Sequence, residues 1–312
     1  MSEKQVFVKV EAKGEFGKAP EERTTEELLD YGLVNIDKLK GPTSHQISDF
    51  VKKILHVKKA GHSGTLDPGV TGVQPVAFGR ATRITQFLLT APKEYVCLMH
   101  VHKDIEESIL REKINLFVGK IKQLPPIKSA VKREERVREI YELEVLEVEG
   151  RDVLFRVLCQ AGTYIRKLCH DIGKELETGA QMAELRRTQA GPFREEDNLI
   201  TLNDLDDAYH YYKKENNDKF IRYCIQNPEN ALKYIPKCWI LDTTIKSLTH
   251  GRDLGIPGIS KLENFKKGQD IAIMSLKGEL VAIGEALMSA VEINTSQKGL
   301  AMTIKKVFME AF

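Results

Sequence analysis

A glycine-rich stretch at residues 61–72, GHSGTLDPGVTG, holds the residues best suited to chemistry. It contains four glycines and a single carboxylate, Asp67. Glycine reaches backbone angles that other residues avoid, so the stretch predicts a shaped loop that another chain can approach closely. Pro68 restricts Asp67 to extended backbone. A lone carboxylate on such a loop could act as a nucleophile, a base or a metal ligand, or could only bond its own backbone in a turn.

Two residues far from this loop could complete a reactive site with Asp67. Arg166 falls in the first turn of a helix predicted after Gly162, where a cation opposes the helix dipole. That conflict favours a carboxylate partner, although a solvated arginine would also fit the local sequence. Tyr95 opens a predicted strand, and a tyrosine there could stack on a base or serve only as a packing residue.

The composition excludes several classes of protein. With 47 basic and 45 acidic residues among 312, net charge alone does not indicate a nucleic-acid partner. No apolar run reaches membrane-spanning length, and the N-terminus lacks the apolar core of a signal peptide. Five scattered cysteines without a CxxC pair favour a reducing, cytoplasmic setting without structural zinc. We expect no metal site at Cys97, His100 and His102, because they do not share one side of a strand.

Basic residues gather at three places, and each cluster alone would suit a solvated surface. The first is formed by Lys52, Lys53, Lys58 and Lys59 beside the glycine loop, the second spans residues 128–138, and the third is Arg186 with Arg187. Further donors and cations lie in or near the loop that carries the acid, namely His62, Thr65, Arg80 and Arg83. Three clusters around one candidate loop favour an RNA backbone as the partner.

Apolar patterns predict the elements that must position these residues. Buried strands are expected at 32–36, 73–78, 95–101 and 153–161. Thr43 and Gln46 have the spacing of a capping box at the start of a helix. One helix should follow Gly162 and a second helical stretch should end at Gly191. Beyond a polar stretch at 216–230, short apolar runs separated by glycines predict a small all-β module.

Taken in order, these segments resemble the TruB-type pseudouridine synthases, and specifically the branch of archaeal and eukaryotic dyskerin-like enzymes. The matching motifs are NIDK at 35–38, GPTSH at 41–45, the glycine loop, GRATR at 79–83, KEY at 93–95, PPIKSAVKR at 125–133, GRDVLFRV at 150–157, AGTYIR at 161–166, MAELRRT at 182–188 and GPF at 191–193. Residues 248–259, LTHGRDLGIPGI, resemble a PUA domain, a small RNA-binding β module. The proline that usually follows the lysine of the first motif is Leu39 here.

The resemblance implies that the protein isomerises uridine to pseudouridine in RNA. Asp67 would be the catalytic aspartate, Tyr95 the residue that stacks on the target base, and Arg166 the charge partner of Asp67. Further residues would shape the pocket or bind RNA, namely Lys38, His62, Thr65, Arg80, Arg83, Leu185 and Arg252. The reaction is redox-neutral and free of hydrolysis, so no cofactor and no metal are expected.

The resemblance also implies an α+β fold. A catalytic domain at 31–228 would be built on a mixed, largely antiparallel sheet, followed by a β-barrel-like PUA domain at 232–312. An N-terminal extension, residues 1–30, would pack on the PUA domain. The expected partners are guide RNA, rRNA or tRNA and the small accessory proteins of box H/ACA particles, with no membrane, in the cytoplasm of an archaeon or the nucleolus of a eukaryote.

Two other functions stay open. The nearer one is a stand-alone synthase that acts on the T-loop uridine of tRNA. The other is a non-catalytic RNA-binding scaffold, which would keep the basic clusters and the PUA domain. A scaffold would not need Asp67, Tyr95 and Arg166 together.

Overall fold

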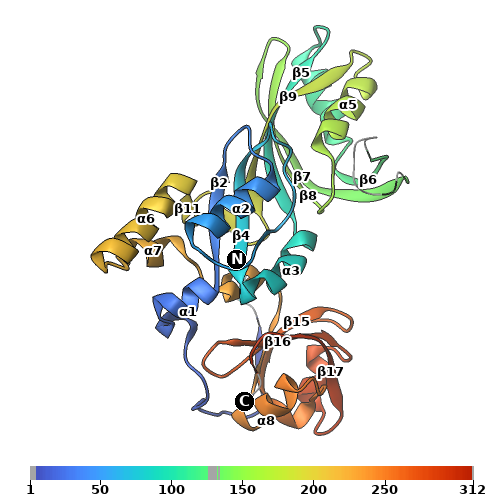
Figure 1. Ribbon diagram of the computed structural model, residues 1–312. Helices are drawn as coiled ribbons and strands as arrows, with labels where there is room; N and C mark the ends of the chain where they lie inside the picture. The colour runs from blue at the N-terminus through green and yellow to red at the C-terminus, as the bar shows by residue number, and fades with distance from the viewer. Residues whose placement is uncertain (1–4, 126–131, 133, 311–312) are drawn as a thin grey trace. The chain divides into compact units, whose positions relative to one another are not determined.

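The computed structural model describes residues 5–125, 132 and 134–310 of the chain (Figure 1). Two compact units divide the chain, one formed by Leu29–Gln226 and the other by Met1–Leu28 together with Asn227–Phe312. Each unit combines helices with a sheet, which confirms the predicted α+β class, but the module predicted as all-β beyond residue 230 also holds helices at Asp242–Thr249 and Ala290–Thr295. The motif predicted at 125–133 and the basic run at 128–138 lie partly outside the described residues. None of the helices described is both long and apolar enough to cross a bilayer.

A largely antiparallel sheet organises the larger unit, as predicted. Its main path runs in the order β11-β2-β4-β9-β5-β8-β7-β6, with β3 on β4 and β10 on β9. Neighbours are antiparallel except for β11 with β2 and β4 with β9. The strands are β2 Tyr31–Lys38, β3 Ala60–His62, β4 Thr71–Gly79, β5 Lys93–Val101, β6 Gly119–Gln123, β7 Arg136–Glu149, β8 Asp152–Cys159, β9 Ala180–Ala190, β10 Phe193–Arg194 and β11 Leu199–Ile200.

Helices of this unit cover the sheet and fix its loops. The capping box predicted for Thr43 and Gln46 is confirmed: Gln46 N donates to Thr43 Oγ1, and Thr43 N donates to Gln46 Oε1. The helices are α1 Thr25–Asp30, which begins in the smaller unit, α2 Ser44–Ile54, the 3₁₀ helix η2 Arg80–Ile84, α3 Thr85–Thr90, α4 Glu107–Asn115, α5 Ile165–Glu175, α6 Leu202–Glu215 and α7 Lys219–Cys224.

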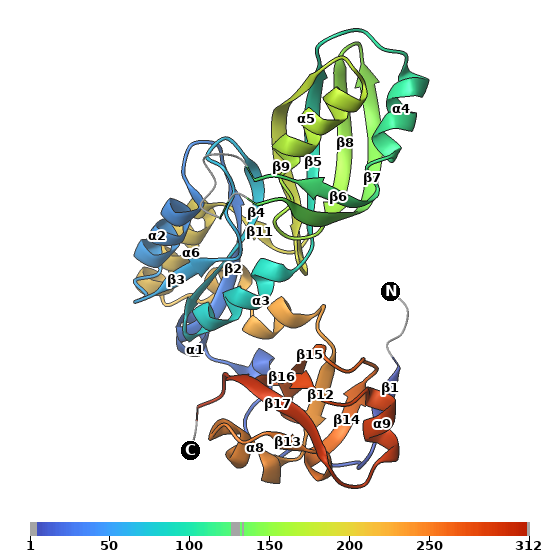
Figure 2. The ribbon, with the colours of Figure 1, turned by 90° about the vertical axis from the view of Figure 1, so that its right-hand side faces the viewer.

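Alternating burial explains how α5 is held on the sheet. In β8, Val153, Phe155 and Val157 are buried on one side, as the alternation of the sequence predicts. Leu168 and Ile172 of α5 pack into the same apolar cluster. α5 therefore lies against the face of β9, β5 and β8 (Figure 2). This packing fixes the position of the first turn of the helix.

The prediction of a second helical stretch before Gly191 is wrong, because residues 180–190 form the strand β9. Its sequence, AQMAELRRTQA, is rich in helix-forming residues. The strand nevertheless pairs with β5 on one side and with β4 on the other. Pairing on both edges outweighs a local helix preference of a few tenths of a kcal/mol per residue.

The smaller unit is a sheet in the order β1-β14-β12-β15-β16-β17-β13. Strand β1 of the N-terminal segment pairs antiparallel with β14, and Arg23 forms a buried double hydrogen bond with Glu229 at 2.7 and 2.8 Å. The strands are β1 Val6–Val8, β12 Lys237–Ile240, β13 Leu254–Gly255, β14 Ile259–Glu263, β15 Asp270–Met274, β16 Leu280–Ala286 and β17 Leu300–Val307. The helices are α8 Asp242–Thr249 and α9 Ala290–Thr295, with 3₁₀ turns η1 Pro20–Glu22, η3 Pro228–Leu232 and η4 Ile256–Gly258.

Candidate active site

Asp67 lies in the loop between β3 and β4, and this loop is anchored on both sides of the acid. On one side, Leu66 N donates to the buried Ser44 Oγ at the start of α2, over 2.7 Å. On the other, the buried ammonium of Lys38 donates to the carbonyls of Pro68 at 3.2 Å and Val70 at 2.7 Å. The carboxylate itself is 59% exposed. A rigid loop therefore presents one acid to solvent.

Arg166 is the charge partner of Asp67 in the structure. Its Nη2 lies 2.8 Å from Asp67 Oδ2, although the two residues are 99 positions apart. Arg166 is the second residue of α5, and a buried side chain, Gln123, fixes the start of this helix by bonding both the N–H and the carbonyl of Tyr164. An exposed ion pair adds at most about 1 kcal/mol to stability, so this contact mainly orients the two groups.

Tyr95 is half-buried on β5, opposite Arg187 on β9. The Arg187 guanidinium contacts the Tyr95 side chain, and burial raises the pKa of the tyrosine hydroxyl, which therefore stays protonated. Arg187 is itself only 1% exposed. Its neighbour Arg186 forms ion pairs with Asp37 and Glu195. The prediction of a basic, RNA-facing cluster at these two arginines is therefore wrong: one is buried and the other is neutralised.

His62, at the end of β3, is a neutral residue beside the acidic loop. Burial, and then the charges of His45 and Arg187, lower the pKa of its imidazole to about 4. Its Nδ1 accepts a hydrogen bond from Gly64 N at 3.3 Å, and its ring meets that of His45 edge-on, with the centroids 4.8 Å apart. Burial also lowers the pKa of Lys38.

The other predicted residues are more widely distributed. Leu185 is half-buried on β9, opposite Cys97, and Thr65 is exposed on the loop. Arg80 bonds Asp30 at 2.6 Å and lies over the ring of Tyr31, so this cation is engaged within the protein. Arg83 is exposed in η2, and Arg252 is exposed in the smaller unit.

The metal-like residues noted in the sequence have other partners. His100 Nδ1 lies 2.7 Å from Asp152, and the Cys97 thiol lies 3.6 Å from that of Cys169 inside the core. Throughout the described part of the chain, no three His, Cys, Asp or Glu side chains are grouped to hold a metal ion.

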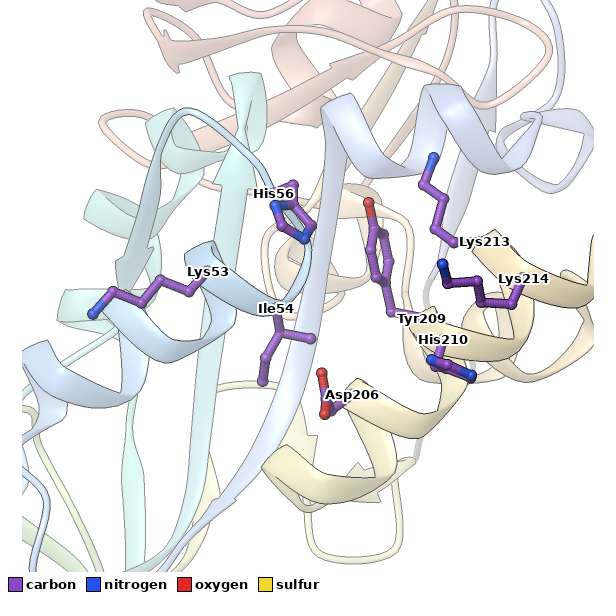
Figure 3. A pocket seen from close by; sticks show the side chains of 8 residues that line it. All are labelled: Lys53, Ile54, His56, Asp206, Tyr209, His210, Lys213 and Lys214. Carbon is purple, nitrogen blue, oxygen red and sulfur yellow. The ribbon is translucent and has the colours of Figure 1, made fainter.

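A surface cavity of about 630 Å³ lies elsewhere in the larger unit, between the end of α2 and α6 (Figure 3). Lys53 at its rim pairs with Asp49 at 2.7 Å. Lys213 lies over the rings of Tyr209 and Tyr212, 5.6 and 4.7 Å from their centroids. The cavity is lined by Lys53, Ile54, His56, Asp206, Tyr209, His210, Lys213 and Lys214. None of these is a predicted site residue. The cavity is therefore separate from the Asp67 site.

Three residues of the site were not found by sequence reasoning: Gln123, Lys93 and Arg187. All three are buried polar side chains. Gln123 and Lys93 stand at the last and first positions of a strand. Arg187 could be found only once residues 180–190 are known to form a strand, because adjacent residues of a strand point to opposite faces and Arg186 and Arg187 cannot then both face solvent on a covered sheet.

Comparison with known families supports these motifs over the whole chain. Residues 52–165 match the family described as "TruB family pseudouridylate synthase (N terminal domain)", and residues 166–233 match "tRNA pseudouridylate synthase B C-terminal domain". A DKCLD (NUC011) domain matches residues 3–48, and a PUA domain matches residues 236–308.

Curated relatives are similar over nearly their full length. A protein named "Probable tRNA pseudouridine synthase B" from Methanothermobacter thermautotrophicus is 53% identical over 297 residues, which is 95% of this chain and 91% of the relative. A protein of the same name from Pyrococcus abyssi is 51% identical over 302 residues, covering 96% and 90%.

Solved structures are similar over almost the entire chain. A "Crystal Structure of a Cbf5-Nop10-Gar1 Complex" matches with a TM-score of 0.94 at 49% identity, over 99% of this chain and 95% of that one. A "Structure of H/ACA RNP bound to a substrate RNA containing 2'-deoxyuridine" matches with a TM-score of 0.92 at 47% identity, over 98% and 95%.

Proposed function

Because the chain belongs to the TruB family of pseudouridylate synthases, we propose that its Asp67 site isomerises uridine in RNA as the catalytic subunit of a box H/ACA guide-RNA particle. The resemblance seen in the motifs is confirmed, and the protein is an RNA pseudouridine synthase. Similarity to chains solved in Cbf5 complexes and in an RNA-bound H/ACA particle, at TM-scores of 0.94 and 0.92, supports the particle. Modification of tRNA without a guide is the second candidate, favoured by the names of the relatives.

The observation that carries the proposed chemistry is the contact between Asp67 and Arg166. Two charged groups from distant parts of the chain meet at 2.8 Å on an exposed surface, where such a pair adds little stability. A binding scaffold has no need for this arrangement. The acid is also held by a loop that Lys38 and Ser44 fix in place.

The reaction requires the target nucleotide to leave its stack, which costs a few kcal/mol. The ring of Tyr95 would return about 1–3 kcal/mol by stacking on the base. Asp67 then acts on the ribose of the flipped nucleotide, either at C1′ or on a sugar proton. The glycosidic bond breaks, the base turns, and C5 bonds to C1′ while the C5 proton leaves and N1 gains one. Arg166 keeps the carboxylate oriented once RNA excludes water from the site.

The remaining roles follow from the same proposal. Lys38 holds the loop, and His62 and Leu185 line the path of the flipped nucleotide. Thr65, Arg80, Arg83 and Arg252 contact the RNA, with Arg80 doing so only after it leaves Asp30.

The proposed domains are a catalytic domain at 31–228, a PUA domain at 232–312 and the extension 1–30 packed on the latter. The pairing of β1 with β14 supports the last of these. The particle would form in the cytoplasm with small accessory proteins.

A reconstituted particle tests this function. The full chain, guide RNA and accessory proteins are incubated with substrate RNA labelled in its uridines, and pseudouridine is measured. Asp67→Asn should abolish conversion while RNA affinity stays within about twofold, since carboxamide and carboxylate have the same shape. Asp49→Asn is the matched control, because the Asp49 side chain of α2 is 47% exposed and pairs with Lys53 on the same helix.

Three outcomes separate the alternatives. Full conversion by Asp67→Asn would contradict the role of the acid. Conversion of a tRNA transcript without guide RNA would favour the stand-alone enzyme. RNA binding without conversion by the unmodified protein would favour the scaffold.

A further inference from the structure

Two cations beside the Asp67 site, Lys93 and Arg187, are buried without a carboxylate partner. They are 5% and 1% exposed. Among the residues that the structure describes, no carboxylate oxygen lies within 4.0 Å of either side chain. Lys93 Nζ instead donates to two carbonyls, those of Leu88 at 2.9 Å and Ala91 at 2.6 Å. Arg187 Nε donates to the Val73 carbonyl at 2.7 Å.

Lys38, which is also buried, donates to three carbonyls as Lys93 does to two, but the buried Arg23 and the half-buried Arg186 are treated differently. Arg23 is 6% exposed and is neutralised by Glu229, and Arg186 is neutralised by Asp37 and Glu195. Burying a charge without a counter-charge is costly even when its hydrogen bonds are satisfied. Burial lowers the pKa of both groups, and that of Lys93, which also feels the charge of Arg187, falls to about 7. Packing alone gives no reason to keep two such groups.

Both cations converge on one point of the loop that carries Asp67. A Cβ atom on Gly64 would lie 3.7 Å from Arg187 Nη1 and 3.8 Å from Lys93 Cε. Arg187 Nη2 lies 3.4 Å from the Gly64 carbonyl. Gly64 is three residues before the acid, so these side chains form the support under the first half of the loop.

Arg187 also connects that loop to Tyr95. Along β9 its backbone is aligned with Tyr95 of β5 and with Gly72 of β4. Gly72 has φ +103°, and a Cβ there would lie 2.2 Å from the Arg187 carbonyl oxygen, so the two backbones are in close contact. One residue thus contacts both ends of the loop and, through its guanidinium, the side chain of Tyr95.

Lys93 supports the same tyrosine from within its own strand. It stands two residues before Tyr95 on β5, and residues two apart share a face of a strand. Its ammonium holds the carbonyls that end α3, so the start of β5 cannot shift without breaking those bonds.

We propose that Arg187 and Lys93 are positioning residues for pseudouridine formation, which hold the Asp67 loop and the Tyr95 ring at the separation that a flipped uridine requires. This inference rests on the roles proposed above for Asp67 and Tyr95. Neither cation touches the substrate. Both are retained at a cost to stability because a displacement of about 1 Å at a reacting group can cost about 10²-fold in rate.

The test compares turnover, RNA affinity and folding in the reconstituted particle. Arg187→Met and Lys93→Met should lower the single-turnover rate at saturating RNA by about 10²-fold and about 10-fold, with RNA affinity within about twofold. Arg23→Met is the control for a buried, paired arginine, and it should lower the melting temperature without changing the rate of the folded protein. Equal rates for Lys93→Met and the unmodified protein, or losses no larger than the loss of folded protein, would overturn the inference.

Arg187→Lys covers the case in which Arg187→Met does not fold. Lysine keeps the charge but loses the planar fork that reaches Val73, Gly64 and Tyr95 together, so the rate should still fall by about 10-fold. In the double variant Arg187→Lys with Tyr95→Phe, the fold-loss in single-turnover rate should be smaller than the product of the fold-losses of the two single variants, because the two side chains interact. Full additivity would contradict the connection through Tyr95.

Asp67→Asn, measured in the same assay, keeps this inference separate from the proposed function. If Asp67→Asn is inactive while Arg187→Lys and Lys93→Met turn over normally, only the positioning role fails. If Asp67→Asn is active, the assignment of the acid fails first, and with it the premise of the positioning role.

Discussion

Replacing Lys93 by methionine should make the protein more stable near neutral pH and less active. Methionine is close to lysine in length and shape, so the substitution removes the buried charge without leaving a large cavity. The titratable groups that act on Lys93 are Arg187, whose charge repels the ammonium, and the thiol of Cys159. Burial raises the pKa of Cys159 to about 12, so this thiol supplies no negative charge near neutral pH.

The magnitude follows from the pKa of Lys93. It is about 7 in the folded protein against 10.5 for an ordinary lysine, which means that the buried ammonium costs about 5 kcal/mol relative to water. Methionine removes this cost but gives up the two hydrogen bonds that the uncharged amine would still make, about 1.5 kcal/mol each. The net gain is about 2 kcal/mol at pH 6.5, which corresponds to a rise in melting temperature of about 5 °C for a unit of this size.

The sign of the effect should reverse with pH. Between pH 7 and 10.5 the unfolded chain holds the Lys93 proton and the folded protein has lost it, so the stability of the unmodified protein rises across this window. The penalty is fully present below pH 7 and nearly gone at pH 10. At pH 10 the methionine variant should therefore be the less stable protein by about 2 kcal/mol, because it lacks the two hydrogen bonds.

Thermal unfolding followed by circular dichroism at pH 6.5, 8 and 10 measures this difference. Other titrating groups cancel when the variant is compared with the unmodified protein at each pH. Lys113→Met is the control, since Lys113 forms an exposed ion pair with Glu175 and should change stability by less than about 1 kcal/mol without reversing sign. A Lys93→Met protein that is less stable at pH 6.5, or a difference that is constant with pH, would refute the reasoning.

Three other perturbations test the site. Gly72→Ala should destabilise the protein by about 3 kcal/mol or more in thermal melts, because its Cβ would meet the Arg187 carbonyl at 2.2 Å, whereas Gly69→Ala in the same loop meets nothing within 4 Å and should have little effect. Arg166→Ala should lower turnover by about 10²-fold with little change in RNA affinity, and equal losses in both would make it a phosphate contact. The imidazole of His62 should titrate near pH 4 by NMR, and a midpoint above 6 would contradict its burial.

Local patterns were enough to predict much of this fold. The capping box of Thr43 and Gln46 and the alternation along β8 depend only on neighbouring residues, and both are present in the structure. The strand at 180–190 was mistaken for a helix because its pairing with β4 and β5 is not visible in its own sequence. The predicted basic cluster agrees with that error: on a helix Arg186 and Arg187 can both face solvent, but on a strand they point to opposite sides.

The Asp67–Arg166 contact is a second long-range feature that local sequence could not predict in full. An arginine in the first turn of a helix is unfavourable, so its sequence position indicated that a partner exists. It did not indicate which acid, because the two residues are 99 positions apart and are brought together by the packing of α5 on the sheet. The resemblance to a family supplied the partner, and the geometry then agreed with it at 2.8 Å.

The cations around Asp67 differ in their exposure to solvent. Arg166 is 65% exposed, so in free protein its attraction to Asp67 is weakened by water and salt. The ammonium of Lys38 and the guanidinium of Arg187 are buried, so their fields and the loop geometry that they hold are the same before and after RNA arrives. RNA that covers the loop would exclude water and strengthen the Arg166 contact several-fold. Under the roles proposed for Asp67 and Arg166, the buried cations hold the geometry in the free protein and in the complex alike, whereas the attraction of Arg166 for Asp67 becomes strong only when RNA covers the pair.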